Sequence, residues 1–191
     1  MGNVDSPAVL QRHRLTVDEY HRMGRAGVFA PDAHVELIEG EVVDMAPMKS
    51  RHASVVARLL AVLQRAVGDE ALVWCQLPLH LGPKSEPEPD LMLLRPRVDF
   101  YAQAHPSADD VLLLIEISDS TLDYDRGVKV PLYARHRITE VWIVDLDNNV
   151  VRFFRDGDGQ GYTDITASET PRATPVAALP GMTIDLSGLL A

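Results

Sequence analysis

The chain has 191 residues, of which 46% are hydrophobic and 24% are charged, and its formal net charge is -10. This length and composition predict one soluble globular domain with a sizeable core and exclude an intrinsically disordered chain. The single cysteine, Cys75, excludes an internal disulfide framework and a zinc site built from thiolates, which fits a reducing, cytoplasmic location. The acidic balance opposes any broad, sequence-independent grip on a polyanion, because such binding depends on many Lys and Arg contacts.

The N-terminal residues carry no targeting signal. Residues 1–7 contain no basic stretch followed by an apolar run, and the longest apolar stretches of the chain are far shorter than a membrane-spanning helix. We therefore expect neither a signal peptide nor a transmembrane helix, and no membrane partner.

Two elements are predicted in the first fifty residues. Thr16 and Glu19 have the spacing of a capping box, which predicts a helix that stops at Gly27. Residues 35–45 form two short alternating runs around a Glu-Gly turn, which predicts a hairpin. We expect this hairpin to flank the main sheet.

The middle of the chain is predicted to form a helix and three strands. From Ser50 the apolar residues follow a helical period until Gly68 ends the helix. The residues that lie away from its apolar face are Arg51, Ser54, Arg58 and Arg65. Strand-like segments follow at residues 72–81, 89–94 and 111–118. The last of these is apolar nearly throughout, which predicts a central strand covered on both faces.

The second half of the chain continues this alternation. A helix over residues 123–136 is interrupted by Pro131, which removes a backbone donor and therefore starts a turn or kinks the helix. Residues 140–145 and 150–155 predict two more strands. The tail is rich in Gly and then in Thr, Pro and Ala, which predicts a strand near residues 162–165 and otherwise a loose edge.

The order of these elements predicts an α/β (mixed α+β) fold. A strand, a crossover helix and a following strand imply a mixed sheet with a right-handed connection, flanked by helices. We expect residues 1–191 to form a single domain. Within it, residues 1–47 form an N-terminal helix and hairpin extension, residues 48–155 the core and residues 156–191 a C-terminal edge.

Three charged residues, Asp90, Glu116 and Lys129, lie at the edges of apolar segments. An ionised group is costly there unless a metal, a partner charge or a substrate compensates it. Asp90 lies near the start of one predicted strand and Glu116 near the end of another, so the two carboxylates meet if these strands are antiparallel neighbours. Such oxygen ligands suit Mg²⁺ or Mn²⁺, and we predict that both carboxylates bind the metal.

These three side chains are the parts of a metal-dependent phosphodiesterase. A bound ion would polarise the scissile phosphate, help deprotonate a water and offset charge on the leaving oxygen. The ammonium of Lys129, at the end of its long stem, would favour the negatively charged transition state. The predicted activity is the hydrolysis of phosphodiester bonds by a metal-activated water.

The order of several motifs resembles a known family. A Pro-Asp dipeptide at 89–90 is followed by Glu-Ile-Ser at 116–118 and by Asp-Arg-Gly-Val-Lys at 125–129. Leu-Tyr-Ala at 132–134 and Glu-Val-Trp-Ile-Val-Asp at 140–145 come next, and residues 36–42 and 47–63 match in the N-terminal half. This pattern is similar to the Uma-two family of bacterial putative restriction-endonuclease-like proteins, which belongs to the PD-(D/E)XK nuclease superfamily.

The resemblance implies a restriction-endonuclease-like core, a Mg²⁺-dependent endodeoxyribonuclease activity and DNA as the substrate. In the superfamily pattern a lysine stands two residues after the glutamate on the same strand, and here that position is Ser118. The resemblance implies that the lysine has migrated to the following helix as Lys129. A homodimer is a further expectation, because cutting two strands calls for two sites.

His52 and Glu36 are secondary candidates for the site. His52 lies on the apolar face of its helix, where it is either a core histidine or, as the resemblance implies, a contact for a phosphate or a metal-bound water. Glu36 either extends the metal site from the hairpin or forms a cross-strand salt bridge.

Other residues near the motifs have structural interpretations. The acids expected to cap the second helix are Asp119, Asp123 and Asp125, and the aromatics expected in the core are Tyr133, Trp142 and Phe153. A group of cations forms either a positive lip beside the site or a solvated helix surface: Arg126, Lys129, Arg135, His136 and Arg137.

Two other functions remain open. A catalytically silent binding or accessory protein that keeps the fold is consistent with the acidic composition. A glycosidase with Asp90 and Glu116 as paired carboxylates fits the acids but leaves Lys129 without a role. Each residue also has a structural alternative, namely a turn for Asp90, an ion pair for Glu116 and surface charge for Lys129.

Overall fold

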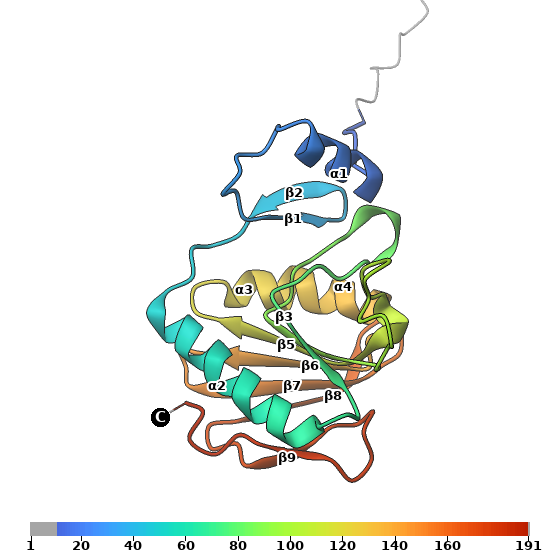
Figure 1. Cartoon of the computed structure of the whole chain (residues 1–191). Coiled ribbons are helices and arrows are strands. Elements are labelled where there is room, and N and C mark those ends of the chain that lie inside the picture. The colour runs from blue at the N-terminus through green and yellow to red at the C-terminus, as the bar shows by residue number, and fades with distance from the viewer. Residues whose placement is uncertain (1–10, 191) are drawn as a thin grey trace, which may run out of the picture.

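The computed structural model describes residues 11–190 and is built around a mixed six-stranded sheet (Figure 1). The strand order is β3-β4-β5-β6-β7-β8, with β5 and β6 parallel and the other neighbours antiparallel. The strands are β3 Leu72–Cys75, β4 Leu91–Leu94, β5 Val111–Ser118, β6 Glu140–Asp145, β7 Val150–Gly157 and β8 Tyr162–Ser168. The predicted mixed α/β architecture is therefore confirmed.

The central strand β5 is buried along its whole length, as its apolar sequence predicts. Its side chains alternate between two cores: Ile115 lies in a cluster with residues of α2 (Ser50–Val67), and Leu114 lies in a second cluster with Tyr133. Glu116 points to the second side, because side chains alternate along a strand. Each fully buried Leu or Ile contributes about 1.5–3 kcal/mol, so β5 is a firm base for the carboxylate near its end.

The crossover between the parallel strands is helical from residue 122 to residue 135. It comprises α3 (Leu122–Tyr124), a π-helical turn (Asp125–Lys129, hereafter the π segment) and α4 (Val130–Arg135). The helix thus continues through Pro131, and the π segment immediately precedes it. The backbone N–H of Val130 bonds to the carbonyl of Asp125, which widens the helix beside a residue that has no N–H of its own.

The N-terminal helix and hairpin form as predicted. In α1 (Val17–Arg25) the N–H of Glu19 donates to the Thr16 hydroxyl at 3.3 Å, and the N–H of Thr16 donates to Glu19 Oε2 at 2.8 Å. The hairpin pairs β1 (Val35–Ile38) with β2 (Glu41–Asp44) through a turn with positive φ at both central residues.

A short contact holds the hairpin against the core. The N–H of Glu86 donates to the carbonyl of Leu37 at 2.7 Å, and the N–H of Gly40 donates to the carbonyl of Lys84, also at 2.7 Å. These bonds fix β1 beside the segment that leads to β4. Two single turns of 3₁₀-helix, Gly82–Lys84 and Ala108–Asp110, lie in the connections on either side of β4.

The C-terminal tail differs from the predicted loose edge. Strand β8 continues to Ser168, and β9 (Ala173–Pro175) pairs with β10 (Thr183–Asp185). The buried apolar residues of the tail, which join the core under α2, are Val176, Ile184, Leu186 and Leu189. Val176 and Leu189 lie in short runs of small and apolar residues, and Ile184 and Leu186 alternate with polar ones. These runs are too short to specify a packed element by themselves, and their burial depends on the surface that α2 presents.

Strand β3 is shorter than predicted. Strand β3 ends at Cys75 rather than at residue 81, because Gln76 has a φ of 50° and Pro78 lacks an N–H. None of the helices in residues 11–190 is long and apolar enough to cross a membrane. The expectation for residues 1–7 lies outside the described part of the chain.

Candidate active site

Asp90 and Glu116 meet at one end of the central sheet. Strands β4 and β5 are antiparallel neighbours with Leu91 opposite Ile115, so the residue before β4 lies beside the end of β5. The N–H of Asp90 donates to Glu116 Oε2 at 3.4 Å, and the N–H of Ile117 donates to Asp90 Oδ2 at 2.8 Å. Both side chains are buried. The structure thus brings together the two carboxylates that the sequence singles out.

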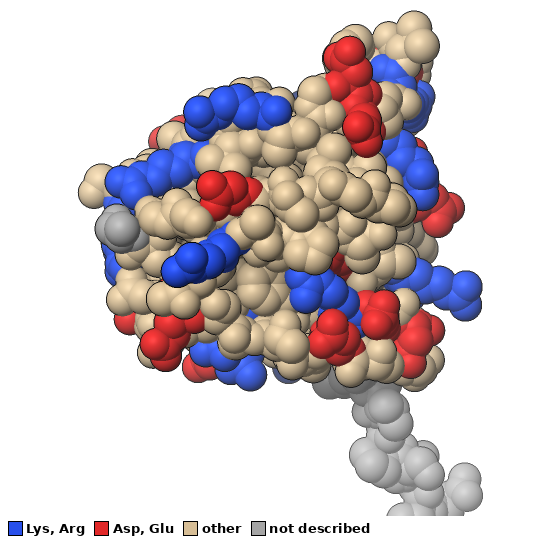
Figure 2. Space-filling view, turned by 90° about the horizontal axis from the view of Figure 1, so that it is seen from below, with Lys and Arg blue, Asp and Glu red and all other residues tan. Residues whose placement is uncertain are grey.

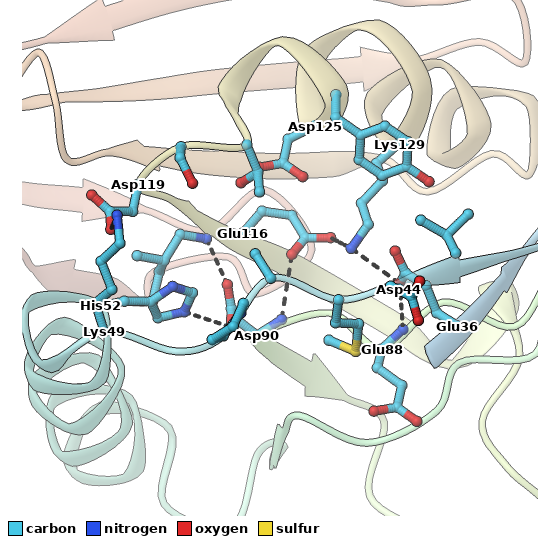
Figure 3. Close-up of a pocket in the computed structure, with 18 residues that line it drawn as sticks. Glu36, Asp44, Lys49, His52, Glu88, Asp90, Glu116, Asp119, Asp125 and Lys129 are labelled. Atoms are coloured by element: carbon cyan, nitrogen blue, oxygen red, sulfur yellow. Dashed lines mark hydrogen bonds and ion pairs between the residues drawn. The ribbon is translucent and has the colours of Figure 1, made fainter. Parts of the chain in front are cut away.

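Lys129 approaches the same carboxylates from the π segment (Figure 3). Its Nζ is 3.3 Å from Glu116 Oε1 and 3.2 Å from Glu36 Oε2, and only 7% of its side chain is exposed. Burial alone would lower the pKa of Lys129, but Glu116, Glu36 and Asp125 outweigh it and raise the pKa above its ordinary value. The side chain is therefore a lasting positive charge inside the site.

Ser118 holds a further carboxylate in place. Its hydroxyl donates to Asp125 Oδ2 at 2.7 Å, and the Thr121 hydroxyl donates to the same oxygen at 2.7 Å. Asp125 is buried within the π segment, and Asp119 forms an ion pair with Lys49. The prediction that these acids cap the second helix is wrong for Asp119 and Asp125, because their side chains line the cavity of the site, whereas Asp123 lies in the first turn of α3 as expected.

Glu36 enters the site from β1. Its Oε2 accepts from the N–H of Glu88 at 3.2 Å in addition to pairing with Lys129, so the cross-strand salt bridge considered for it does not form. Glu88 also lines the cavity beside these residues. Burial, and then the charge of Glu36, raise the pKa of Glu88. The hairpin thus supplies one acid and orients the segment that carries another.

His52 lies beside Asp90, at the start of α2. Its Nε2 is 2.8 Å from Asp90 Oδ1, which also accepts from Gln76 Nε2 at 3.2 Å. The hydrogen bond to Asp90 raises the pKa of His52, although burial opposes this. The contact is with a carboxylate of the site and not with the apolar core.

These residues surround a cavity of about 260 Å³. Its charged lining consists of seven carboxylates and two lysines: Glu36, Asp44, Glu88, Asp90, Glu116, Asp119, Asp125, Lys49 and Lys129. Burial raises the pKa of Glu116 to about 8, although Lys129 acts to lower it. The cavity therefore contains an excess of negative charge that a cation would relieve.

The predicted positive lip does not form beside this cavity. Lys129 is buried within the site, and Arg135 pairs with Glu39 at 2.6 Å. The described lining of the cavity does not include Arg126, His136 or Arg137. These residues follow one another closely in sequence, but the helix and the turn after it point them in different directions.

Comparison with known proteins assigns a family. The model of the Uma2 family, described as a putative restriction endonuclease, matches residues 17–187. The chain belongs to the Uma2 family. The crystal structure of a putative nuclease belonging to DUF820 from Anabaena variabilis ATCC 29413 has a TM-score of 0.72 and 17% sequence identity, covering 92% of this chain and 97% of that chain. At this identity the likeness shows a shared fold. No curated protein matched.

Two tyrosines of the Uma2 site were missed by sequence reasoning. Tyr133 was assigned to the core, and it is fully buried, but its hydroxyl donates to Glu116 Oε1 at 2.5 Å. The Tyr124 hydroxyl is buried and has no hydrogen-bond partner within residues 11–190, and Tyr124 lines the cavity. The spacing of Lys129 and Tyr133, four residues apart in a helix, was the available signal, since such residues share a face.

The donor chemistry of this Uma2 site fits a hard divalent cation. Its acids offer oxygen ligands and its net charge is negative. Each oxygen of Asp90 and Glu116 already faces a donor, and within residues 11–190 no group of three His, Cys, Asp or Glu is arranged to hold an ion. A metal would use the lone pairs that remain on Asp90 Oδ2 and Glu116 Oε2, because each of these oxygens accepts one hydrogen bond within the described residues.

Proposed function

We propose that this Uma2 protein is a metal-dependent endonuclease that hydrolyses DNA phosphodiester bonds with a metal-activated water. The family description, a putative restriction endonuclease, supports this reaction class. The substrate, the metal and the roles of individual residues are part of the proposal.

The observation that carries the proposal is the position of Lys129. The strand position two residues after Glu116 is Ser118, which has no charge, yet an ammonium lies 3.3 Å from Glu116 Oε1. It arrives from the π segment and is desolvated. A buried acid near the end of a strand, a second acid across from it and a buried amine are the set that phosphodiester hydrolysis needs.

Asp90 and Glu116 are the proposed ligands for Mg²⁺ or Mn²⁺. When bound, such an ion supplies Lewis acidity toward a phosphate oxygen and lowers the pKa of a water. The chain contributes by fixing the two carboxylates: Ile117 holds Asp90 through its N–H, and Tyr133 holds Glu116 through its hydroxyl. Both supports come from rigid elements, so little ordering is left for the reaction itself.

Lys129 is the proposed electrostatic stabiliser. It lines the cavity, and its ammonium is fixed between Glu36 and Glu116, so it requires no reorganisation when negative charge develops. His52 is a titratable group 2.8 Å from Asp90 Oδ1 and is placed to accept or release a proton beside that carboxylate.

A plasmid-nicking assay tests the proposal. The purified protein is incubated with supercoiled DNA while Mg²⁺ or Mn²⁺ is titrated, and the expected result is nicking that requires the metal. Asp90→Ala and Glu116→Ala should each reduce the rate by about 10²-fold or more, because each removes a proposed ligand.

Glu70→Ala is the matched control, because Glu70 is an exposed acid just after α2. It should leave the rate unchanged. Direct titration of Mn²⁺ into the wild-type chain and into Asp90→Ala checks metal binding apart from turnover. Cleavage that persists in both Asp90→Ala and Glu116→Ala would rule out this site as its source.

A catalytically silent, nuclease-fold binding protein is the second candidate. It is favoured by the fact that every oxygen of Asp90 and Glu116 already has a donor within the described chain. DNA binding that depends on salt, without cleavage at any metal concentration, is the outcome that would select this alternative.

A further inference from the structure

The exposed face of α2 carries a row of arginines. Arg51, Arg58 and Arg65 are seven residues apart, a spacing that keeps them on one side of a helix, and all three are exposed. The helix contains no Asp or Glu, although the whole chain has a net charge of -10. The row is therefore a local basic stripe on an acidic protein.

The hydrogen bonds of Arg51 and Arg65 leave their positive charge in place. Arg51 donates to the side-chain oxygen of Asn149 at 2.7 Å, and Arg65 donates to the carbonyl of Ala61 at 2.9 Å. Arg58 donates to the carbonyl of Gly188 at 3.3 Å. The acceptors of Arg51 and Arg65 are neutral, and a guanidinium with five N–H groups has donors left for a phosphate.

A groove runs along this stripe, between α2 and the C-terminal segment. One hollow of about 200 Å³ is lined by Arg51, and a second of about 480 Å³ is lined by Arg65. Ser54, Arg58 and Leu189 line both hollows, so the two are continuous. Between the arginines the second hollow is lined by small residues, Ser54, Ala57 and Ala61, together with Leu59 and Val62.

Among the residues that the structure describes along the groove, one is an acid. Asp185 lines the second hollow, and its carboxylate accepts from the N–H of Ser187 at 2.9 Å. On the face of the molecule that carries α2 and β9, Lys and Arg side chains gather on one side with an acidic side chain among them (Figure 2). The basic residues outnumber the acid along the groove.

The same helix leads to the cavity. Lys49, at the N-terminal end of α2, and His52, in its first turn, both line the cavity, and Arg51 lies between them in sequence at the start of the stripe. A polyanion bound along the groove would therefore pass directly to the carboxylates. The cavity is lined mainly by acids and suits a cation, whereas the groove is lined by arginines and suits phosphates.

We propose that the groove along α2 binds the phosphate backbone of DNA beside the scissile bond, with Arg51, Arg58 and Arg65 as the phosphate contacts. The inference rests on the proposed function and names the surface that holds its substrate. Successive arginines are about 10 Å apart along the helix, or roughly three base-pair rises of DNA, so the stripe spans about six.

A salt-dependent binding assay tests this. The affinity of fluorescein-labelled duplex DNA is measured by anisotropy at several salt concentrations, with EDTA and in parallel with Ca²⁺ in place of Mg²⁺. The Arg51→Gln, Arg58→Gln, Arg65→Gln triple variant should bind more weakly, and the slope of log affinity against log salt should fall by about 2–3, since each lost phosphate contact contributes about 0.9.

The control is a second triple variant with the same charge change, Arg12→Gln, Arg22→Gln and Arg25→Gln, at exposed positions before and within α1. It should keep the wild-type slope. Equal loss in both variants, or no loss in either, would overturn the α2 groove as the binding surface. Circular dichroism verifies that both variants are folded.

Cleavage is measured on the same proteins, so the two proposals can fail separately. If the wild type nicks DNA and the α2 variant binds like the wild type, the groove is refuted and the nuclease stands. If the wild type binds through α2 but never cleaves, the groove stands and the nuclease is refuted. If the wild type binds no DNA, the groove is refuted outright.

Discussion

Two buried glutamates on neighbouring strands of the central sheet have opposite surroundings. Glu140, at the start of β6, accepts from Arg155 Nε at 2.6 Å, from Trp142 Nε1 at 2.7 Å and from the N–H of Ala177 at 2.8 Å. Glu116, near the end of β5, and Glu36 both form an ion pair with the single ammonium of Lys129. The first carboxylate is compensated on all sides, and the second is not.

The difference shows what distinguishes a structural acid from a candidate catalytic one. Burial alone does not separate them, since Glu140 is 0% exposed and Glu116 is 3% exposed. What separates them is the charge balance: a cation and two neutral donors surround Glu140, whereas acids surround Glu116 and a cavity opens beside it. Surplus negative charge beside a cavity is a stronger sign of a site than a buried acid alone.

The largest expected difference between the two glutamates is in their contribution to stability. Glu140→Ala should lower the free energy of unfolding by about 3–5 kcal/mol, because it leaves the Arg155 guanidinium and two other donors without their acceptor. Glu116→Ala should cost less, because Lys129 keeps Glu36 and one of several crowded acids is removed. Urea unfolding of the two variants measures both values, and equal losses would mean that Glu116 is just as structural as Glu140.

The next effect is on catalysis by the proposed nuclease. Lys129→Met removes the buried charge while keeping a stem of similar length, and nicking should fall by about 10²–10³-fold. Arg155→Met removes the cation beside Glu140 and should leave the rate per folded molecule unchanged. Cleavage that survives in Lys129→Met and is abolished in Asp90→Ala would refute the migration of the lysine to the helix.

The two tyrosines of the crossover helix give a smaller and matched contrast. Tyr133→Phe removes the hydroxyl that donates to Glu116 and should cost about 1.5–3 kcal/mol of stability. Tyr124→Phe removes a buried hydroxyl that has no partner, so stability should change by less than about 0.5 kcal/mol or rise slightly. Thermal unfolding distinguishes them, and a large loss in Tyr124→Phe would show that its hydroxyl is bonded after all.

The last expected effect is on the pH dependence of stability, and it is confined to the range between the two pKa values of Glu116. The pKa of Glu116 is about 8 in the folded protein, above its ordinary value of 4.5, so the folded state holds this proton more tightly than the unfolded chain. The contribution of Glu116 to the free energy of unfolding therefore falls as pH rises from about 4.5 to about 8.

Glu116→Gln cannot ionise and should lack this decline. Urea unfolding in EDTA at about pH 5 and about pH 8.5 should show the variant gaining on the wild type as pH rises. The raised pKa of Lys129 acts only above its ordinary value of 10.5, outside this window. Parallel stability curves for the two proteins would contradict a raised pKa at Glu116.

Most of the fold follows from local pattern. The capping box at Thr16, the Glu-Gly turn of the hairpin and the apolar run of β5 each specify an element by local chemistry, and each element forms as predicted. The tail could not be predicted in this way, because isolated residues such as Ile184 are buried only once α2 provides a surface to cover.

The sequence by itself determined which charges matter. Asp90, Glu116 and Lys129 stand beside apolar segments, and an ionised group in that position is costly unless something compensates it. From the sequence, Asp90 and Glu116 meet only if β4 and β5 are antiparallel neighbours, and the sequence does not show whether they are. Residues far apart along the chain come together through the pairing of strands, and that pairing depends on the whole core.

Only the tertiary structure decided how Lys129 and Tyr133 reach Glu116, and that the hydroxyl of Ser118 bonds to Asp125. The π segment beside Pro131 widens the helix, and Lys129 at its end contacts Glu116 and Glu36. The same folding separates the acidic cavity from the arginine stripe of α2. A sequence shows the charge of each side chain, but its neighbours in space set the cost of burying that charge and therefore what it is able to do.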